Sequence, residues 1–127
     1  MNQASEEFDI EWLKEDDGLI LHYTSGSTGQ PKGVLHVQKA MLLHYISGKY
    51  VLDLKEGDIY WCTADPGWVT GTSYGVFAPW LNGVTNCIAG GRFSPEQWYS
   101  MIETFKVTIW YTAPTALRML MSAGDDV

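Results

Sequence analysis

The sequence predicts an α/β fold in which strand–helix units alternate along the chain and the strands form a mostly parallel sheet. Short apolar runs rich in β-branched and aromatic residues occur at residues 59–63 (IYWCT), 84–89 (VTNCIA) and 107–111 (VTIWY). A segment with the spacing or the capping signals of a helix follows each run. Strands and helices that alternate at this spacing indicate parallel strands whose two faces are covered by helices.

The first half of the chain contributes two short strands, a helix and a compact apolar strand. Residues 19–23 (LILHY) predict a strand that leads directly into a loop of Gly, Ser and Thr residues, and residues 34–36 predict a short return strand. Residues 38–50 have apolar spacing suited to a helix, in spite of Gly48 near its end. A turn then precedes the strand at residues 59–63.

The next unit begins with a rigid turn at residues 65–67 (DPG). Residues 72–81 predict a helix that residues 82–83 (NG) end. Pro79 lies inside this helix, and we expect a kink there because proline removes a backbone hydrogen bond.

Capping signals define the last two helices. Ser94 is a good N-cap, and Gln97 is placed to complete a capping box for a helix that runs to about Lys106. After the strand at residues 107–111, the final predicted helix covers residues 114–122, and Gly124 ends it.

Charge and composition argue against several classes of partner. The 127-residue chain has a net charge of −7, with acidic residues clustered at both ends, which argues against nucleic acid and against anionic membranes. No apolar run approaches the about 20 residues that span a bilayer, and the first residues lack a signal-peptide pattern, so we expect a cytoplasmic protein. Residues 1–18 are an acidic N-terminal segment, and residues 19–127 belong to one domain. Cys62 and Cys87 lie in apolar runs without metal-ligand spacing and are expected to be buried, reduced thiols.

The stretch TSGSTGQPKG at residues 24–33, the glycine-rich loop, has the chemistry of a phosphate site. Its glycines let backbone N–H groups approach an anion, its hydroxyls can donate to phosphate oxygens, and Lys32 adds a positive charge. The spacing excludes the Walker pattern, because the fifth residue after Gly26 is Pro31 and Gly33 follows Lys32. A flexible linker is the alternative, but a linker has no use for a fixed Pro-Lys-Gly end.

Two further unusual stretches follow predicted strands. They are residues 64–71 (ADPGWVTG) and residues 112–115 (TAPT). Ligands of open α/β sheets bind at the carboxyl ends of the strands. We therefore expect both stretches and the glycine-rich loop to lie at the carboxyl ends of strands in the sheet.

The loop resembles a known family signature. YTSGSTGQPKGV, residues 23–34, is similar to the YTSGSTGxPKGV loop of the adenylate-forming superfamily and departs from it at no defining position. In that superfamily the loop holds the β- and γ-phosphates of ATP while a carboxylate attacks the α-phosphate, which gives an acyl-adenylate and pyrophosphate. The resemblance implies this phosphate-binding role for Thr24, Ser25, Gly26, Ser27, Thr28, Gly29 and Lys32.

Residues 61–83 and 111–120 are similar to segments of the acetyl-CoA synthetase branch of that superfamily. The resemblance implies that Trp68, Val69 and Thr70 line a small acyl pocket, with Thr70 also near the route of coenzyme A. It implies acetate, ATP and coenzyme A as substrates, with Mg²⁺. Taken alone, Trp68 would more often be a core aromatic residue.

Two stretches leave their roles open. Residues 111–115 either contact the adenine or the pantetheine arm, or simply pack at the end of a strand. Residues 90–98 (GGRFSPEQW) differ from the EG-x-P turn that the branch leads us to expect, so no coenzyme A contact is assigned there.

Several segments of the family are missing from the sequence, including the segment with the magnesium-binding glutamate, the ribose-binding aspartate and the catalytic lysine. We therefore expect the chain to be a part of the large N-terminal domain of a longer enzyme, with no catalytic residue and no metal ligand of its own and inactive alone. The alternatives are a ligase for another short-chain or aromatic acid, and a non-catalytic nucleotide-binding module.

Overall fold

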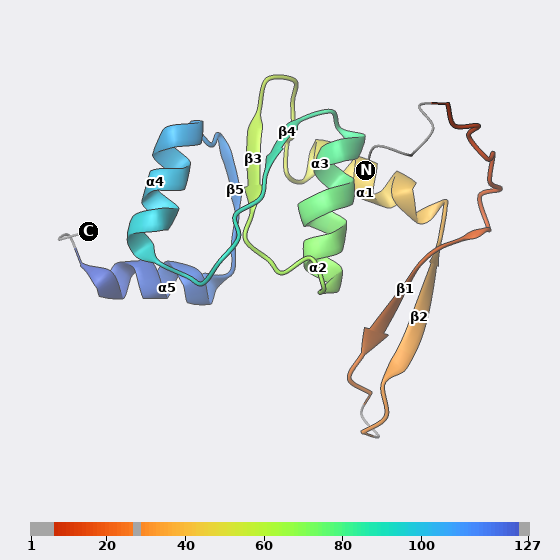
Figure 1. Ribbon diagram of the computed structural model, residues 1–127, viewed down its shortest axis with the longest axis horizontal. Coiled ribbons are helices and arrows are strands. Elements are labelled where there is room, and N and C mark those ends of the chain that lie inside the picture. Colours follow the sequence, from red (N-terminus) through yellow and green to blue (C-terminus); the bar gives the residue numbers. More distant parts are fainter. Residues whose placement is uncertain (1–6, 27–28, 125–127) are drawn as a thin grey trace. The chain divides into compact units, whose positions relative to one another are not determined.

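The computed structural model describes residues 7–26 and 29–124, and it divides into two compact units, Met1–Lys39 and Ala40–Val127 (Figure 1). Ser27 and Thr28, both predicted to bind phosphate, lie outside the described residues. Among the described residues, no helix combines the length and the apolar character needed to cross a membrane.

The first unit is a β-hairpin made of β1 (Gly18–Thr24) and β2 (Lys32–Val37). The strands pair antiparallel, with Tyr23 opposite Gly33 and Thr24 opposite Lys32. Both predicted strands are present and longer than expected. The expectation that β1 belongs to the parallel sheet is wrong, because β1 pairs with β2 and not with the strands of the second unit. β1 and β2 pair antiparallel because the connection between β1 and β2 is shorter than the crossover of about a dozen residues that parallel neighbours need.

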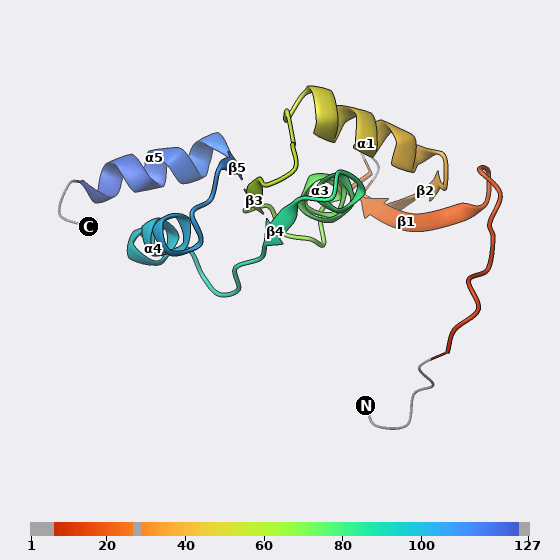
Figure 2. The ribbon, with the colours of Figure 1, turned by 90° about the horizontal axis from the view of Figure 1, so that it is seen from above.

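The second unit contains a parallel sheet of β3 (Ile59–Cys62), β4 (Thr85–Cys87) and β5 (Ile109–Tyr111) in the order β4-β3-β5. The predicted α/β class is therefore confirmed, although each strand is shorter than the apolar run that predicted it. Helices α4 (Pro95–Phe105) and α5 (Pro114–Ala123) lie on one side of this sheet in both ribbon views, and α1 (Ala40–Tyr50) lies on the other (Figures 1 and 2).

Alternation along the strands gives the sheet two different apolar faces. On the face toward α1, Tyr60 packs with Leu54 and Val84 to form the buried core cluster. On the opposite face, Trp61 stacks on Trp110 with ring centroids 6.0 Å apart and meets the edge of Trp98 from α4 at 5.2 Å. Because successive side chains of a strand point to opposite faces, both faces of the sheet carry apolar side chains, and helices cover both.

The helix predicted at residues 72–81 begins three residues earlier. It consists of α2 (Val69–Thr72), a π-helical segment η1 (Ser73–Phe77) and α3 (Ala78–Leu81). The start is earlier because the turn after β3 closes with a hydrogen bond from the Trp68 N–H to the Asp65 carbonyl, and the chain then enters the helix at once.

Pro79 coincides with the change of helical pitch. In an α-helix the residue at this position would donate its N–H to the Gly75 carbonyl, and proline has no N–H to give. The Asn86 side chain from β4 donates to that carbonyl instead, at 2.7 Å. The Asn86 side chain therefore ties the helix to the sheet through a hydrogen bond.

The predicted N-cap of α4 and the predicted ends of the last two helices are confirmed. Ser94 accepts a hydrogen bond from the Gln97 N–H at 3.4 Å at the start of α4, and Lys106 ends that helix in the left-handed conformation with φ 54°. Gly124, with φ 77°, follows α5. α1 begins at Ala40, and Gly48 inside it is explained by its packing, because a Cβ there would overlap the Asn82 side-chain amide.

Candidate functional site

The glycine-rich loop connects the two strands of the hairpin in the first unit. Thr24 ends β1 and Lys32 begins β2 directly opposite it, so a hydroxyl and an ammonium group flank the base of the loop. The Gly29 N–H donates to the Gly26 carbonyl at 3.0 Å. Gly29 has φ 79°, a conformation that favours glycine.

Gly26 is required by close packing within this loop. A Cβ at this position would overlap the backbone carbonyl oxygen of Gln30 and lie 3.3 Å from carbons of the Lys32 side chain. The missing side chain thus lets the loop fold back on itself and lets the Lys32 stem lie along it. Thr24, Ser25, Gly29 and Lys32 are exposed, so their polar groups are open to an anion.

The three predicted acyl-pocket residues lie in the second unit, just after the carboxyl end of β3. Trp68 is the N-cap residue of α2, and Val69 and Thr70 form its first turn. Trp68 is 74% exposed, so it does not belong to the core that the described residues form. Its indole instead forms an uncovered apolar surface beside the helix start.

Asp65, Thr72 and Gly71 fix the turn that carries Trp68. The Asp65 carboxylate accepts the Gly67 N–H at 2.7 Å, and the Thr72 hydroxyl donates to the Pro66 carbonyl at 2.6 Å. Gly71 is buried, and a Cβ there would overlap the Asp65 backbone. The helix start and the turn before it therefore form one tightly packed piece.

The end of β5 lies beside this piece. The Thr63 and Thr112 hydroxyls hydrogen-bond at 2.8 Å, and the Thr63 N–H donates to the Tyr111 carbonyl at 3.0 Å. The Tyr111 ring stacks on Tyr74 from η1, with centroids 5.6 Å apart and planes 18° from parallel. Two of the three stretches singled out in the sequence, residues 64–71 and residues 112–115, thus follow neighbouring strands at one edge of the sheet.

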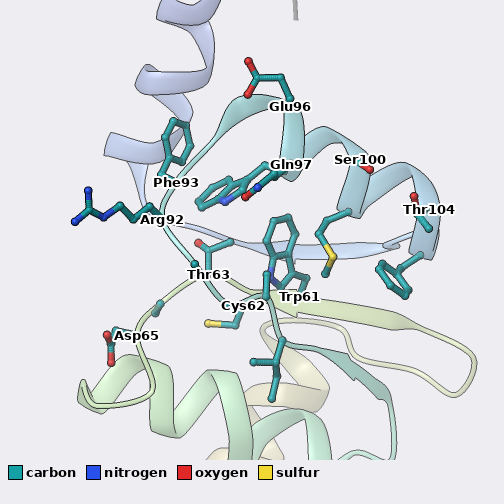
Figure 3. Close-up of a pocket in the computed structure, with 18 of the residues that line it drawn as sticks. Trp61, Cys62, Thr63, Asp65, Arg92, Phe93, Glu96, Gln97, Ser100 and Thr104 are labelled. Atoms are coloured by element: carbon teal, nitrogen blue, oxygen red, sulfur yellow. The ribbon is translucent and has the colours of Figure 1, made fainter.

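A cleft of about 1270 Å³ opens between the ends of β3 and β4 and the helix α4 (Figure 3). Thr63, Cys62 and Trp61 line it from the sheet, while Gln97, Ser100 and Thr104 line it from α4. The acyl-pocket residues do not line it. Two charged side chains also line the cleft: Arg92, from the loop after β4, and Glu96, from the first turn of α4.

Burial and hydrogen bonding shape the titration of groups along this cleft. Burial raises the pKa of the Cys62 thiol, so the thiol stays protonated and unreactive near neutral pH. The Ser94 hydroxyl donates to Glu96 and lowers the pKa of that carboxyl, so Glu96 is an anion at the cleft rim. Cys62 and Cys87 are both free thiols, as predicted, but they are only half buried.

The sequence points to the glycine-rich loop and to the predicted acyl residues, but it does not show which groups hold the turn at Trp68. Asp65 and Thr72 are predicted only as parts of a turn and a helix, Thr63 only as the last residue of a strand, and Thr112 only as part of the stretch at residues 112–115. The pairing of Thr63 with Thr112 carries a weak sequence signal, since Thr63 ends one predicted strand and Thr112 directly follows another.

The chain belongs to the AMP-binding enzyme family, whose model matches residues 2–127. A loop with the chemistry of a phosphate site, followed along the chain by a parallel α/β unit, agrees with that family. The predicted membership of the adenylate-forming superfamily and of its acetyl-CoA synthetase branch is confirmed by the relatives. Acetyl-coenzyme A synthetase of Bacillus subtilis (strain 168) is 70% identical over 125 residues, which cover 98% of this chain and 22% of that protein.

Acetyl-coenzyme A synthetase of Drosophila melanogaster is 51% identical over 119 residues, covering 91% of this chain and 18% of the relative. Among solved structures, an acyl-CoA synthetase of Brucella canis matches with a TM-score of 0.91 and 36% identity, over 97% of this chain and 22% of that one. The anthranilate CoA ligase AuaEII, solved in complex with anthranoyl-AMP, matches with a TM-score of 0.84 and 30% identity, over 94% of this chain and 23% of that one. The chain thus spans about a fifth of the length of these relatives.

Proposed function

We propose that the chain is part of an acetate–CoA ligase. The whole protein would activate acetate with ATP, giving acetyl-adenylate and pyrophosphate, and would then transfer the acetyl group to coenzyme A to form acetyl-CoA. The observation that carries the proposal is the 70% identity to an acetyl-coenzyme A synthetase over nearly the whole chain.

In this proposal the glycine-rich loop holds the ATP phosphates. The role covers Thr24, Ser25, Gly26, Ser27, Thr28, Gly29 and Lys32. Support comes from the hydrogen bond between the Gly29 N–H and the Gly26 carbonyl, which brings two glycines of the loop together, and from the exposed Lys32 at the base of the loop.

Trp68, Val69 and Thr70 form one wall of the acyl pocket. The exposed Trp68 indole and the adjacent half-open Val69 offer a rigid apolar surface to a methyl group. Against such a wall, one additional methylene changes binding by about 1–3 kcal/mol, which is enough to separate acetate from propionate. The opposite walls of the pocket would come from other parts of the whole protein.

Large apolar side chains of the second unit are exposed, which supports burial against further polypeptide. Val51 is 78% exposed, Ile88 is 70% exposed and Trp80 is 65% exposed.

In residues 7–26 and 29–124, no group of three or more His, Cys, Asp or Glu side chains could hold a metal ion. Mg²⁺, which the resemblance implies, would be held by residues outside this chain. The inactivity of the chain alone and a cytoplasmic location stay predictions.

Acetate-dependent exchange of labelled pyrophosphate into ATP by the whole protein tests this function. Exchange with acetate that exceeds exchange with propionate and benzoate supports an acetate ligase. Preference for propionate or benzoate would instead favour a ligase for another short-chain or aromatic acid. ATP binding without exchange for any carboxylate would contradict the ligase and favour a non-catalytic nucleotide-binding module.

A further inference from the structure

We infer that the hydrogen bond between Thr63 and Thr112 positions the acyl-pocket wall, so that these two threonines are positioning residues for acid selectivity. The inference rests on the proposed function. Neither hydroxyl belongs to the predicted acyl or phosphate residues, and both directly follow strands of the parallel sheet.

Thr63 and Thr112 join the loops that follow β3 and β5, beyond the last paired residues of the two strands. β3 ends at Cys62 and β5 at Tyr111, yet the Thr63 N–H still donates to the Tyr111 carbonyl at 3.0 Å, and the two hydroxyls meet at 2.8 Å. Both threonines are half buried, which strengthens the hydrogen bond relative to one in water. The loops therefore separate only after these residues.

Thr63 is connected to Trp68 through a short, tightly packed segment. Only Ala64 stands between Thr63 and the turn that begins at Asp65. That turn closes onto Trp68 through the Asp65 carbonyl at 3.0 Å, and Thr72 holds it from the helix side. A shift of Thr63 is therefore transmitted to the indole instead of being absorbed by a flexible loop.

The segment that follows β3 and the end of β5 meet at a second contact. Tyr74, six residues after Trp68, stacks on Tyr111, which directly precedes Thr112. The segment from Thr63 to Tyr74 is thus attached to the end of β5 at both of its ends. Loss of the hydroxyl contact frees one end and leaves Trp68 held only through the other.

The opposite end of the same strand pair provides a matched control. Thr108, just before β5, accepts the Ile59 N–H at 3.0 Å and donates to Asp58 at 2.8 Å. This contact joins the same two strands through a threonine hydroxyl, but it lies at their amino ends. Its removal changes strand pairing without touching the segment that carries Trp68.

The experiment compares Thr63→Val, Thr112→Val, the double variant, Thr112→Ser and Thr108→Val in the whole protein. We expect each single valine variant at position 63 or 112 to lower kcat/KM for acetate roughly tenfold, with a smaller loss for propionate. The acetate-to-propionate ratio should then fall by roughly threefold or more. Thr112→Ser should keep the wild-type ratio, and the double variant should be no worse than the single ones, because both hydroxyls are then gone.

Thr108→Val should lower the unfolding temperature but keep the wild-type ratio. An unchanged ratio in both Thr63→Val and Thr112→Val overturns the inference, as does an equal shift in Thr108→Val. Failure of the proposed function looks different, because the wild-type protein would then show no acid-dependent exchange at all, and that result would overturn the inference as well. If the wild-type protein prefers another acid, the selectivity ratio is measured with two acids that it accepts and that differ by one methylene.

Discussion

The backbone of Gly71 lies against the carbonyl oxygen of Asp65 so closely that a Cβ on Gly71 would overlap it. This contact packs the first turn of α2 onto the turn that precedes it, and Trp68 lies between the two. Replacement of Gly71 by alanine should therefore force the turn and the helix start apart. We expect a loss of about 1–3 kcal/mol in the free energy of unfolding, as overpacking generally costs, together with a reduced preference for acetate.

Gly90→Ala is the matched control for this variant. Nothing lies within 4 Å of a Cβ at Gly90, so we expect its unfolding free energy to change by less than about 0.5 kcal/mol. Urea unfolding of the whole protein measures both variants. Equal stabilities for Gly71→Ala and Gly90→Ala would contradict the packing argument.

Lys32→Ala should raise the KM for ATP. A charged hydrogen bond to phosphate is worth enough that its loss corresponds to a roughly 10- to 100-fold increase in KM, while the KM for acetate should change little. Lys39→Ala is the control, because Lys39 is an exposed lysine of the same unit that pairs with the exposed Asp16. Steady-state kinetics of the whole protein give both values, and a Lys32→Ala variant with the ATP kinetics of Lys39→Ala would count against the phosphate role.

Asn86 and Pro79 should be energetically coupled, because the Asn86 amide supplies the Gly75 carbonyl with the donor that Pro79 lacks. Asn86→Ala should lower the free energy of unfolding by about 1–2 kcal/mol. The same change in a Pro79→Ala background should cost less by about 1 kcal/mol, since an alanine at this position brings its own N–H. A double-mutant cycle from urea unfolding measures this difference, and strictly additive effects would show that the two residues are independent.

Alkaline pH should destabilise the protein through Tyr60. Burial, followed by the neighbouring Cys62 and Tyr111, raises the pKa of Tyr60 far above the ordinary value of about 10. The unfolded chain therefore releases the phenolic proton first, so the stabilisation is complete below about pH 10 and declines as the pH rises further. Cys62 acts in the same direction, because burial raises its pKa as well.

Tyr60→Phe should reduce this alkaline loss by about 1 kcal/mol between pH 10 and pH 11, since one titrating group is removed. Tyr99→Phe, which changes an exposed tyrosine of α4, is the control. Unfolding free energies measured at intervals from pH 8 to pH 11 test the prediction. The same pH profile for wild type and Tyr60→Phe would disprove it.

Local sequence signals predicted the elements whose ends are set by local chemistry. The Ser94 cap, the end of α4 near Lys106 and the Gly124 terminus depend on backbone conformation and on neighbours within a few residues, so the sequence is sufficient to find them. The start of the helix at Val69 was missed because it depends on Gly71 packing against Asp65, a contact that helix propensity does not describe.

The sequence by itself determined the α/β class and predicted a phosphate-binding role for the glycine-rich loop, because composition, spacing and turn chemistry are properties of short segments. Only the tertiary structure decided that the loop closes an antiparallel hairpin and that Thr63 meets Thr112. Those two hydroxyls are 49 residues apart along the chain. Their meeting depends on the order β4-β3-β5, which makes β3 and β5 neighbours across an intervening strand in the sequence, and no local pattern specifies that order.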